Sequence, residues 1–319
     1  MLTSYISLFS EIAANCLTMK FLPIILSLTL FVACNSQPQK REIILPEGKL
    51  ISCENTLKIV QESSPGYVII DVRKEKDFMA NHIPGAINTW RPDYEDLSNE
   101  VKGIMGDKAQ METLLQSWGI KADDTLILYD GKGNSNACRL WWILKQYGFE
   151  NLRIMDGSYL RWKKLNFPTD ALIATPAKGD VKLKELDPKL SADIEDVKNH
   201  LTKKGFLLDS RTIKEYEGIV KKGNVKRGGH IPTAVRFDWS EVVGIGGNDD
   251  GTFEDSATIA QKLQAINVSQ NDNLILYCQS GVRSACVTFV LYEMLGYQNI
   301  FNYDGSWLEW GNSELPIEL

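Results

Sequence analysis

Cys278 stands in the sequence where its sulfur could act as a nucleophile. It follows the apolar run 274–277 and leads into a short stretch, 279–284, that contains Gly and Ser. A helix-like pattern comes next, so backbone N–H groups and a helix N-terminus would face the sulfur. Such surroundings favour the thiolate over the thiol and are typical of a reactive cysteine rather than a packing residue.

An upstream copy of this stretch lacks the cysteine. The run DTLILYDG parallels the later run DNLILYCQ, which places Asp130 where Cys278 stands. The same interval of 148 residues separates Asp156 from Asp304, so the two copies align here without a gap. The chain is therefore predicted to be a tandem duplication in which only the second copy can do thiol chemistry at this position.

Both copies also contain an Asp-x-Arg motif followed by a His-Ile-Pro motif. His82 follows Asp71 by 11 residues, whereas His230 follows Asp209 by 21, so the second copy has an insertion of ten residues. The basic residues just before the second His-Ile-Pro motif are Lys221, Lys222, Lys226 and Arg227. A basic loop near the cysteine could attract small anions, and a solvated surface loop is the alternative.

The elements that must position these residues alternate between strands and helices. Apolar strand patterns occur at 68–71, 126–129, 152–155, 207–209, 274–277 and 300–303. Helix patterns occur at 111–119, 140–147, 259–266 and 287–295. This order predicts an α/β fold in which each copy has a mainly parallel sheet with helices on both faces. Reactive loops in such sheets lie at the carboxyl ends of strands, where Cys278 falls.

The chain has 319 residues, which is enough for two domains with separate cores. We expect a first domain at 43–170, a polar, Lys-rich and Pro-containing linker at 171–188, and a second domain at 189–319. The net charge of −6 argues against nucleic acid as a main partner.

The N-terminus resembles the signal of a bacterial lipoprotein. Met19 and a lysine precede a short apolar stretch that ends in Val-Ala and Cys34. We expect residues 1–34 to be an upstream extension plus this signal, with Met19 as the start and Cys34 as the lipidated residue. The apolar stretch is too short to span a bilayer comfortably, so the membrane would be reached only through the lipid. This places the protein in the cell envelope, facing the periplasm or the outer membrane; an ordinary cleaved signal is the alternative.

The other cysteines have no metal or disulfide spacing. Six cysteines occur in all, and Cys138 and Cys286 are equivalent positions of the two copies, each eight residues after Asp130 or Cys278. Both are expected to pack in the core, while Cys53 has no evident role. With only three histidines, two of them repeat-equivalent, no metal site or cofactor is expected.

Taken together, the motifs resemble the two-domain rhodanese family of thiosulfate and 3-mercaptopyruvate sulfurtransferases. The resemblance covers nearly all of residues 43–319 and includes the Asp-Gly-Ser-Trp motif that begins at Asp304. It implies that Cys278 takes a sulfane sulfur from a small anionic donor, thiosulfate or 3-mercaptopyruvate. The resulting persulfide would pass that sulfur to cyanide or a thiol acceptor.

Residues of the loop would then stabilise the negative charge of the persulfide. The expected cradle consists of Gln279, Ser280, Gly281, Val282, Arg283 and Ser284, acting through backbone amides and the dipole of the following helix. Gly281, like Gly133 in the first copy, would let the loop curl. Arg283 is expected to bind donor oxygens or a carboxylate, with a structural ion pair as the alternative.

Two features bear on the choice of donor. In mercaptopyruvate-using relatives, a serine placed like Ser280 is thought to work with an aspartate and a histidine, here Asp71 and His82, in a proton relay. Both positions recur in the second copy, so a structural role is an equal alternative. Relatives often carry an arginine where this chain has Glu215, whose charge would repel an anion. Arg211, in the second Asp-x-Arg motif, is expected to brace its own strand end.

Two other functions remain open. A cysteine-based phosphatase or arsenate reductase needs a longer loop than this one, because four residues lie between Cys278 and Arg283. The shorter loop suits a single sulfur better than a tetrahedral oxyanion. A non-catalytic sulfur-binding module is the remaining alternative, which the intact cysteine loop makes less favoured.

Overall fold

The computed structural model describes residues 48–203, 205–244 and 250–319. The described residues all belong to one compact unit. The expected lipoprotein signal, with Met19 and Cys34, lies outside the described residues. Within the described ranges, no helix has the length and hydropathy needed to cross a bilayer.

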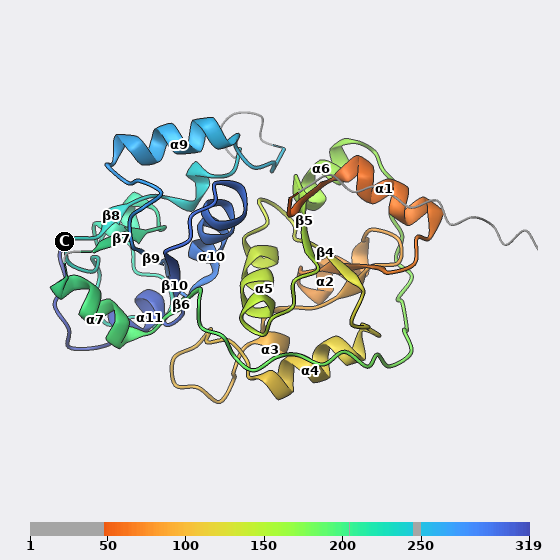
Figure 1. Cartoon of the computed structure of the whole chain (residues 1–319), viewed down its shortest axis with the longest axis horizontal. Helices are drawn as coiled ribbons and strands as arrows, with labels where there is room; N and C mark the ends of the chain where they lie inside the picture. Colours follow the sequence, from red (N-terminus) through yellow and green to blue (C-terminus); the bar gives the residue numbers. More distant parts are fainter. Residues whose placement is uncertain (1–47, 204, 245–249) are drawn as a thin grey trace, which may run out of the picture. The chain divides into compact units, whose positions relative to one another are not determined.

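The first domain contains a five-stranded sheet in the order β1-β5-β4-β2-β3 (Figure 1). Every neighbouring pair of strands in it is parallel. Its elements in chain order are β1 (Leu50–Ser52), α1 (Cys53–Glu62), β2 (Tyr67–Asp71), α2 (Glu75–Ala80), β3 (Ile87–Asn88), α3 (Arg91–Tyr94), α4 (Lys108–Ser117), β4 (Thr125–Tyr129), α5 (Ser135–Gln146), β5 (Leu152–Asp156) and α6 (Ser158–Lys164).

The second domain repeats this topology with the order β6-β10-β9-β7-β8, again entirely parallel. Its elements are β6 (Ser191–Ala192), α7 (Ile194–Thr202), β7 (Phe206–Asp209), α8 (Ile213–Tyr216), β8 (Val235–Arg236), η1 (Trp239–Glu241), α9 (Ser256–Ala265), β9 (Leu274–Tyr277), α10 (Val282–Phe289), η2 (Val290–Met294), β10 (Ile300–Tyr303) and α11 (Ser306–Trp310). The predicted duplication is therefore visible strand by strand.

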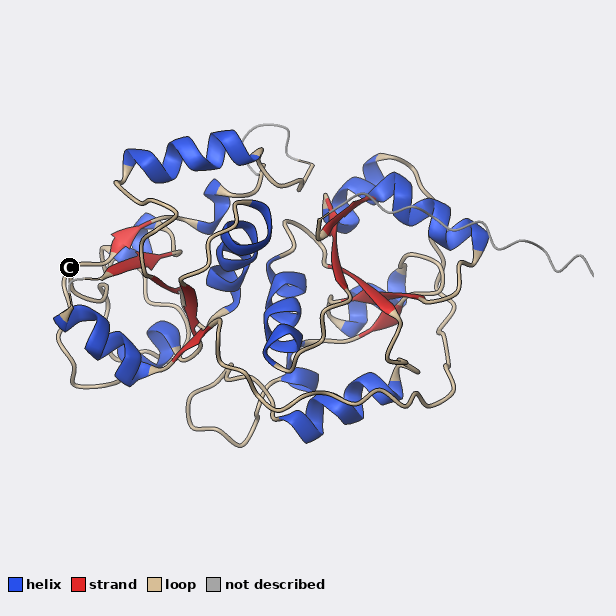
Figure 2. Cartoon of the chain, viewed as in Figure 1, coloured by secondary structure: helices blue, strands red, loops and turns tan. Residues whose placement is uncertain are grey.

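Helices cover both faces of each sheet (Figure 2). Along β4, Leu126 and Leu128 pack with α4 and α5, whereas Ile127 packs with α1, α2 and α6. In the second domain α9 and α10 lie on one face, and α7 and α11 lie on the other. Alternate residues of a strand point to opposite faces, which is why a strand covered on both sides is apolar at every position. The predicted α/β fold is confirmed.

The two domains share a core, although separate cores were expected from the length. Helices α5 and α10 pack against each other, and Trp141 meets Phe289 edge-on with ring centroids 5.0 Å apart. Buried side chains of both domains belong to one hydrophobic cluster. Both helices are buried around most of their circumference, so each needs a second apolar surface besides its own sheet.

Some elements differ from the sequence expectation. The edge strands β1 and β6 and the helices α1 and α7 that follow them were not predicted. The last long helix begins earlier than expected, at Val282 directly after the loop, and ends in the π-helical turn η2. The chain at 171–188 has no helix or strand but is attached to the first domain, since Lys184 N–H donates to the Tyr147 carbonyl at 3.0 Å.

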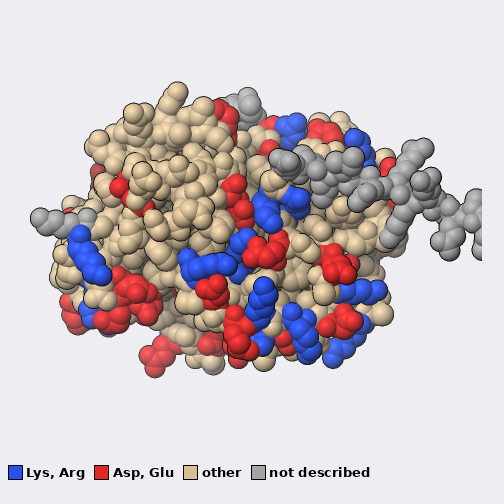
Figure 3. Space-filling view, viewed as in Figure 1, with Lys and Arg blue, Asp and Glu red and all other residues tan. Residues whose placement is uncertain are grey.

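Charged side chains of both signs lie mainly over the lower half of the face shown in Figure 3, and the upper left of that face is largely uncharged. The chain as a whole carries a net charge of −6.

Candidate active site

The Cys278 loop connects the end of β9 to the start of α10. Gly281 makes the turn with a φ of +71°, in the left-handed region that side chains rarely adopt. A Cβ at this position would lie 2.7 Å from Nη1 of Arg139. Glycine is thus required both by the backbone angle and by its neighbour, as the sequence predicted.

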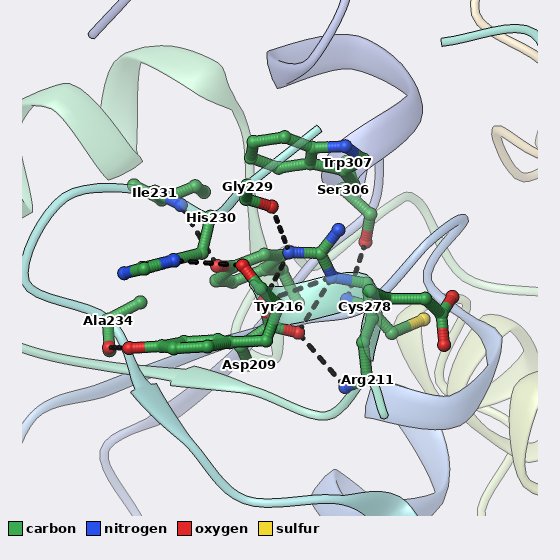
Figure 4. Close-up of polar contacts among 12 residues, drawn as sticks. Asp209, Arg211, Tyr216, Gly229, His230, Ile231, Ala234, Cys278, Ser306 and Trp307 are labelled. Carbon is green, nitrogen blue, oxygen red and sulfur yellow. Dashed lines mark hydrogen bonds and ion pairs between the residues drawn. The ribbon is translucent and has the colours of Figure 1, made fainter. Parts of the chain in front are cut away.

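Ser306 holds the loop from behind. Its Oγ accepts a hydrogen bond from the amide of Cys278 at 3.2 Å (Figure 4). It also accepts one from the amide of Gly281 at 3.0 Å and donates to the Tyr303 carbonyl at 2.7 Å. The amide of Gly281 therefore does not face the sulfur, which corrects the expectation that the whole loop forms the cradle. The serine of the Asp-Gly-Ser-Trp motif was visible in the sequence, but its role as a loop anchor was not.

Cys278 is 1% exposed, and burial alone would raise the pKa of its thiol. The positive charge of Arg283, the Ser284 hydroxyl and amide, and the Ser280 amide act in the opposite direction. Together they outweigh burial, so the pKa of Cys278 is lowered from its ordinary value. The site therefore favours a thiolate, the nucleophilic form of cysteine.

The matching loop of the first domain has kept its shape around a carboxylate. Gly133 takes a φ of +77°, as Gly281 does in the second domain. The Asp130 carboxylate accepts hydrogen bonds from the amides of Lys132, Asn134 and Asn136, each at 2.9 Å. Burial nevertheless raises the pKa of Asp130 to about 6, with the amides acting in the opposite direction.

Two of these amides have direct counterparts in the Cys278 loop. Adding the repeat interval of 148 residues to Lys132 and Asn136 gives Ser280 and Ser284, whose amides stabilise the Cys278 thiolate. The two loops therefore direct the same backbone groups at an anion. In the first domain the protein supplies that anion itself, through Asp130, and no sulfur is present to react.

Arg283 forms a bidentate ion pair with Glu215. Its Nη1 and Nη2 each lie 2.8 Å from a carboxylate oxygen of Glu215, which is 1% exposed. Burial would raise the pKa of Glu215, but Arg283, Thr212 and Lys222 lower it to about 2. The guanidinium of Arg283 is thus bound by the protein, which favours the alternative of a structural ion pair; direct contact with the donor stays a prediction. Equally, Glu215 does not act as an unpaired repelling charge.

The Asp-x-Arg motif braces the strand end, as expected for Arg211. Asp209 accepts from the amide and Nε of Arg211, both at 2.9 Å, and Nη2 of Arg211 donates to the Gly229 carbonyl at 2.8 Å (Figure 4). The guanidinium also lies over the Trp307 ring, 4.4 Å from its centroid. All of these contacts are internal, so Arg211 supports the site rather than forming its surface.

The His-Ile-Pro motif is also structural in the second domain. The His230 ring stacks on Tyr216 with centroids 3.7 Å apart, and its Nδ1 is 3.0 Å from the Tyr216 carbonyl oxygen. The Ile231 amide donates to the Tyr277 hydroxyl at 3.1 Å. The motif thereby connects α8 to the strand that carries Cys278.

The proton relay suggested for Asp71, His82 and Ser280 is not assembled. Asp71 accepts from the Tyr129 hydroxyl at 2.5 Å and from its own Asp-x-Arg arginine. The His82 ring nitrogens contact the carbonyls of Phe78 at 2.9 Å and Leu172 at 3.1 Å. Asp209 makes the matching contact with Arg211, and His230 Nδ1 makes the matching contact with the Tyr216 carbonyl, so the structural alternative accounts for both residues.

The first domain contributes to the site through residues outside the repeated motifs. Arg91 Nη2 is 3.4 Å from the Ser280 hydroxyl, and a Cβ on Gly103 would lie 3.2 Å from Cβ of Ser280. Arg139, which is fully buried, donates to the Gly103 carbonyl at 2.7 Å and pairs with Asp304 at 2.5 Å. Arg91 and Arg139 carried no sequence signal, because Trp239 and Val287 stand 148 residues later in the second copy. Gly103 does recur there, as Gly251, but its contact with the other domain's loop was not predicted.

Each domain covers the other's loop in the same way. Asp304 accepts a hydrogen bond from the Met105 amide at 3.1 Å, and Asp156 accepts one from the Phe253 amide at 2.9 Å. Both members of these pairs are related by the repeat interval of 148 residues. The active loop is therefore enclosed only when both domains are present.

The other described cysteines are placed as packing residues. Cys138 and Cys286 are fully buried, and Cys286 Sγ lies 3.7 Å from the Gly133 carbonyl oxygen. Cys53 donates to the Asp156 carbonyl at 3.3 Å, and burial raises the pKa of its thiol to about 12. Among the described residues, no group of His, Cys, Asp and Glu side chains is arranged to hold a metal ion.

Known proteins resemble this chain over both domains. The rhodanese-like domain model matches twice, at residues 57–165 and 193–313. A putative thiosulfate sulfurtransferase of Haloferax volcanii is 33% identical over 266 residues, covering 81% of this chain and 91% of its own length. The thiosulfate sulfurtransferase of Corynebacterium glutamicum is 33% identical over 267 residues, covering 80% and 86%.

Solved structures share the fold. SseA of Escherichia coli, described as a 3-mercaptopyruvate sulfotransferase, matches with a TM-score of 0.71 at 22% identity, over 82% of this chain and 99% of its own. At this identity the likeness concerns the fold alone. The twin parallel sheets, the paired loops and the sequence relatives lead to one conclusion: the chain belongs to the rhodanese family and carries two rhodanese-like domains in tandem.

Proposed function

We propose that this protein is a sulfurtransferase that carries sulfur as a persulfide on Cys278. One observation carries the proposal: amides that bind a carboxylate in the first domain have counterparts aimed at the Cys278 sulfur in the second. A site built to hold an anion around a reactive thiolate suits both the thiolate and the persulfide that it would become.

The reaction needs no cofactor. The Cys278 thiolate attacks the outer sulfur of thiosulfate, a sulfur–sulfur bond forms, and sulfite leaves with the electron pair of the bond that breaks. Cyanide or a thiolate then attacks the outer sulfur of the persulfide, and the Cys278 thiolate is released. Both steps conserve charge, so the loop holds one negative charge throughout.

Thiosulfate is the favoured donor, because the two curated relatives described above carry the name thiosulfate sulfurtransferase. Because Asp71 and His82 do not form a proton relay with Ser280, these residues give no additional support to 3-mercaptopyruvate as the donor. A phosphatase is disfavoured, since both prongs of Arg283 are engaged by Glu215 and are not offered to a phosphate.

The test is thiocyanate formation from cyanide by the full chain, with thiosulfate or 3-mercaptopyruvate as donor. Cys278→Ser is the matched control, because it removes the nucleophile with little change in volume. We expect turnover by the wild type only, with thiosulfate the better donor. Equal thiocyanate formation by wild type and Cys278→Ser would overturn the proposal, and a preference for mercaptopyruvate would overturn the choice of donor.

We also infer that the protein is exported and anchored by lipid at Cys34, with no other attachment to the membrane. The support is the pattern of a positive start, a short apolar stretch and a small residue before Cys34. Metabolic labelling with a palmitate analogue should mark the wild type but not Cys34→Ser. Label retained by Cys34→Ser, or absent from both proteins, would contradict the anchor.

A further inference from the structure

The ten-residue insertion before the second His-Ile-Pro motif is held in place on α11 and the segment after it. The Arg227 guanidinium donates to the carbonyls of Leu315 at 2.8 Å and Trp310 at 3.1 Å. The Trp307 indole in turn donates to the Arg227 carbonyl at 3.2 Å. These contacts make the insertion part of the second domain rather than the freely solvated loop that was the alternative.

The insertion also contacts the reactive loop. The Gln279 side-chain amide donates to the Lys222 carbonyl at 2.7 Å, and Gln279 is the residue directly after Cys278. A Cβ on Gly223 would lie 3.8 Å from the same Gln279 nitrogen. The backbone of Lys222 is therefore fixed beside the loop that carries Cys278.

The Lys222 side chain brings a second positive charge to the buried ion pair. Its Nζ is 3.4 Å from the Oε2 of Glu215, whose carboxylate already binds both prongs of Arg283. Two cations thus share the Glu215 carboxylate, and Arg283 also faces the Cys278 thiolate. Because the Lys222 side chain is 54% exposed and Glu215 is 1% exposed, the positive charge of Lys222 faces solvent.

We propose that Lys222, which is paired with Glu215 and exposed to solvent, is the residue that attracts the anionic sulfur donor. The inference rests on the proposed sulfur transfer, since it assigns a residue to donor binding. Lys222 would act before the chemical step, by raising the local concentration of a small anion near the Cys278 loop. Its ammonium group is paired with Glu215 and not with the sulfur, so it is a positioning residue and not a catalytic one.

Steady-state kinetics with thiosulfate give the first test. Lys222→Met should raise KM roughly threefold to tenfold and leave kcat nearly unchanged, because one partly solvated charge near the Cys278 loop is lost. Lys221→Met is the matched control: it removes the same charge from the adjacent residue, whose Nζ is 3.5 Å from the Lys226 carbonyl and contacts no carboxylate among the described residues. Equal effects of the two variants, or a fall in kcat alone, would overturn the assignment.

A second test does not depend on sulfur transfer. The rates at which Cys278 reacts with iodoacetate, an anion, and iodoacetamide, a neutral analogue, are compared in each protein. Lys222→Met should lower the iodoacetate-to-iodoacetamide ratio, and Lys221→Met should leave it near the wild-type value. An unchanged ratio in Lys222→Met would overturn the role of Lys222 even if sulfur transfer is established. A lowered ratio in a protein that transfers no sulfur would uphold anion attraction while the proposed function fails.

Discussion

At the scale of single residues, the site depends on a few polar groups that offset the cost of burying a thiolate. The Ser284 hydroxyl is buried and makes no hydrogen bond to a protein oxygen or nitrogen. An unpartnered buried hydroxyl costs free energy unless an anion accepts its proton. The Cys278 thiolate is the anion that it stabilises, and this explains why a serine is placed inside the first turn of α10.

Replacing Ser284 with Ala should therefore raise the pKa of Cys278, because the thiolate loses one donor while the thiol loses little. Fewer molecules would carry a thiolate at neutral pH, so alkylation by iodoacetamide should slow roughly threefold to tenfold. The pH profile of the alkylation rate should shift to higher pH. Ser280→Ala is the control, because the backbone amide of Ser280 and not its hydroxyl acts on Cys278. If the pH profile of alkylation in Ser284→Ala overlays that of the wild type, the Ser284 hydroxyl does not stabilise the thiolate.

At the scale of elements, the strand–loop–helix unit has been kept in both copies while its central residue has changed. In the first domain the Asp130 carboxylate occupies the loop, and burial disfavours its ionised form. The folded state therefore binds a proton more readily than the unfolded chain, in which the pKa of an aspartate is about 3.9.

This difference predicts the direction of a pH effect. Stability contributed by protonated Asp130 is fully present below the pKa of the unfolded chain and is lost as pH rises through about 6. Between pH 4 and 7 the free energy of unfolding of the wild type, relative to Asp130→Asn, should fall by about 1 to 3 kcal/mol. Urea unfolding of both proteins across this range measures the difference. A difference that does not change with pH, or that grows as pH rises, would contradict the structure of this cradle.

The sequence was informative where one element carries its own pattern. Strands β4 and β9 were predicted because strands covered on both faces are apolar at every position. Strands β1 and β6 have only three and two residues and lie at sheet edges, so they leave almost no pattern. The cysteine loop and its glycine turn were predicted for the same local reason, since spacing within one loop determines them.

Contacts between distant segments could not be predicted in this way. Glu215 and Arg283 are 68 residues apart, and nothing in either neighbourhood pairs their charges. Sequence alone therefore assigned Arg283 to the donor, and only the folded chain reveals its buried partner. Arg91 and Gly103 reach Ser280 from the other domain, which no motif within one copy encodes.

At the scale of the whole molecule, duplication gives each domain a covering role for the other. The fully buried Arg139 links the first domain to the second through Asp304, and it also binds the Gly103 carbonyl of its own domain. A buried cation that loses its partner is costly, because the remaining charge stays desolvated. The second domain has the nucleophile, but its loop is enclosed by residues of the first.

Replacing Asp304 with Ala should therefore lower the free energy of unfolding by about 3 to 5 kcal/mol, through the unpaired Arg139. It should also reduce the reactivity of Cys278, because the covering segment near Met105 loses its attachment. Asp156→Ala is the control: it breaks the equivalent hydrogen bond over the inactive loop and should leave Cys278 reactivity near the wild-type level. Urea unfolding measures the loss of stability, and the alkylation rate measures the reactivity of Cys278. Equal losses of reactivity in the two variants would contradict the claim that each domain covers the loop of the other.

The central claim is that Cys278 carries the transferred sulfur. The most direct measurement is the mass of the intact protein after incubation with thiosulfate, followed by peptide mapping of the modified residue. The account predicts a gain of one sulfur atom on the peptide that contains Cys278, absent from Cys278→Ser and lost when cyanide is added. A wild-type protein that stays folded, reacts with iodoacetamide at Cys278 and yet gains no sulfur would contradict it.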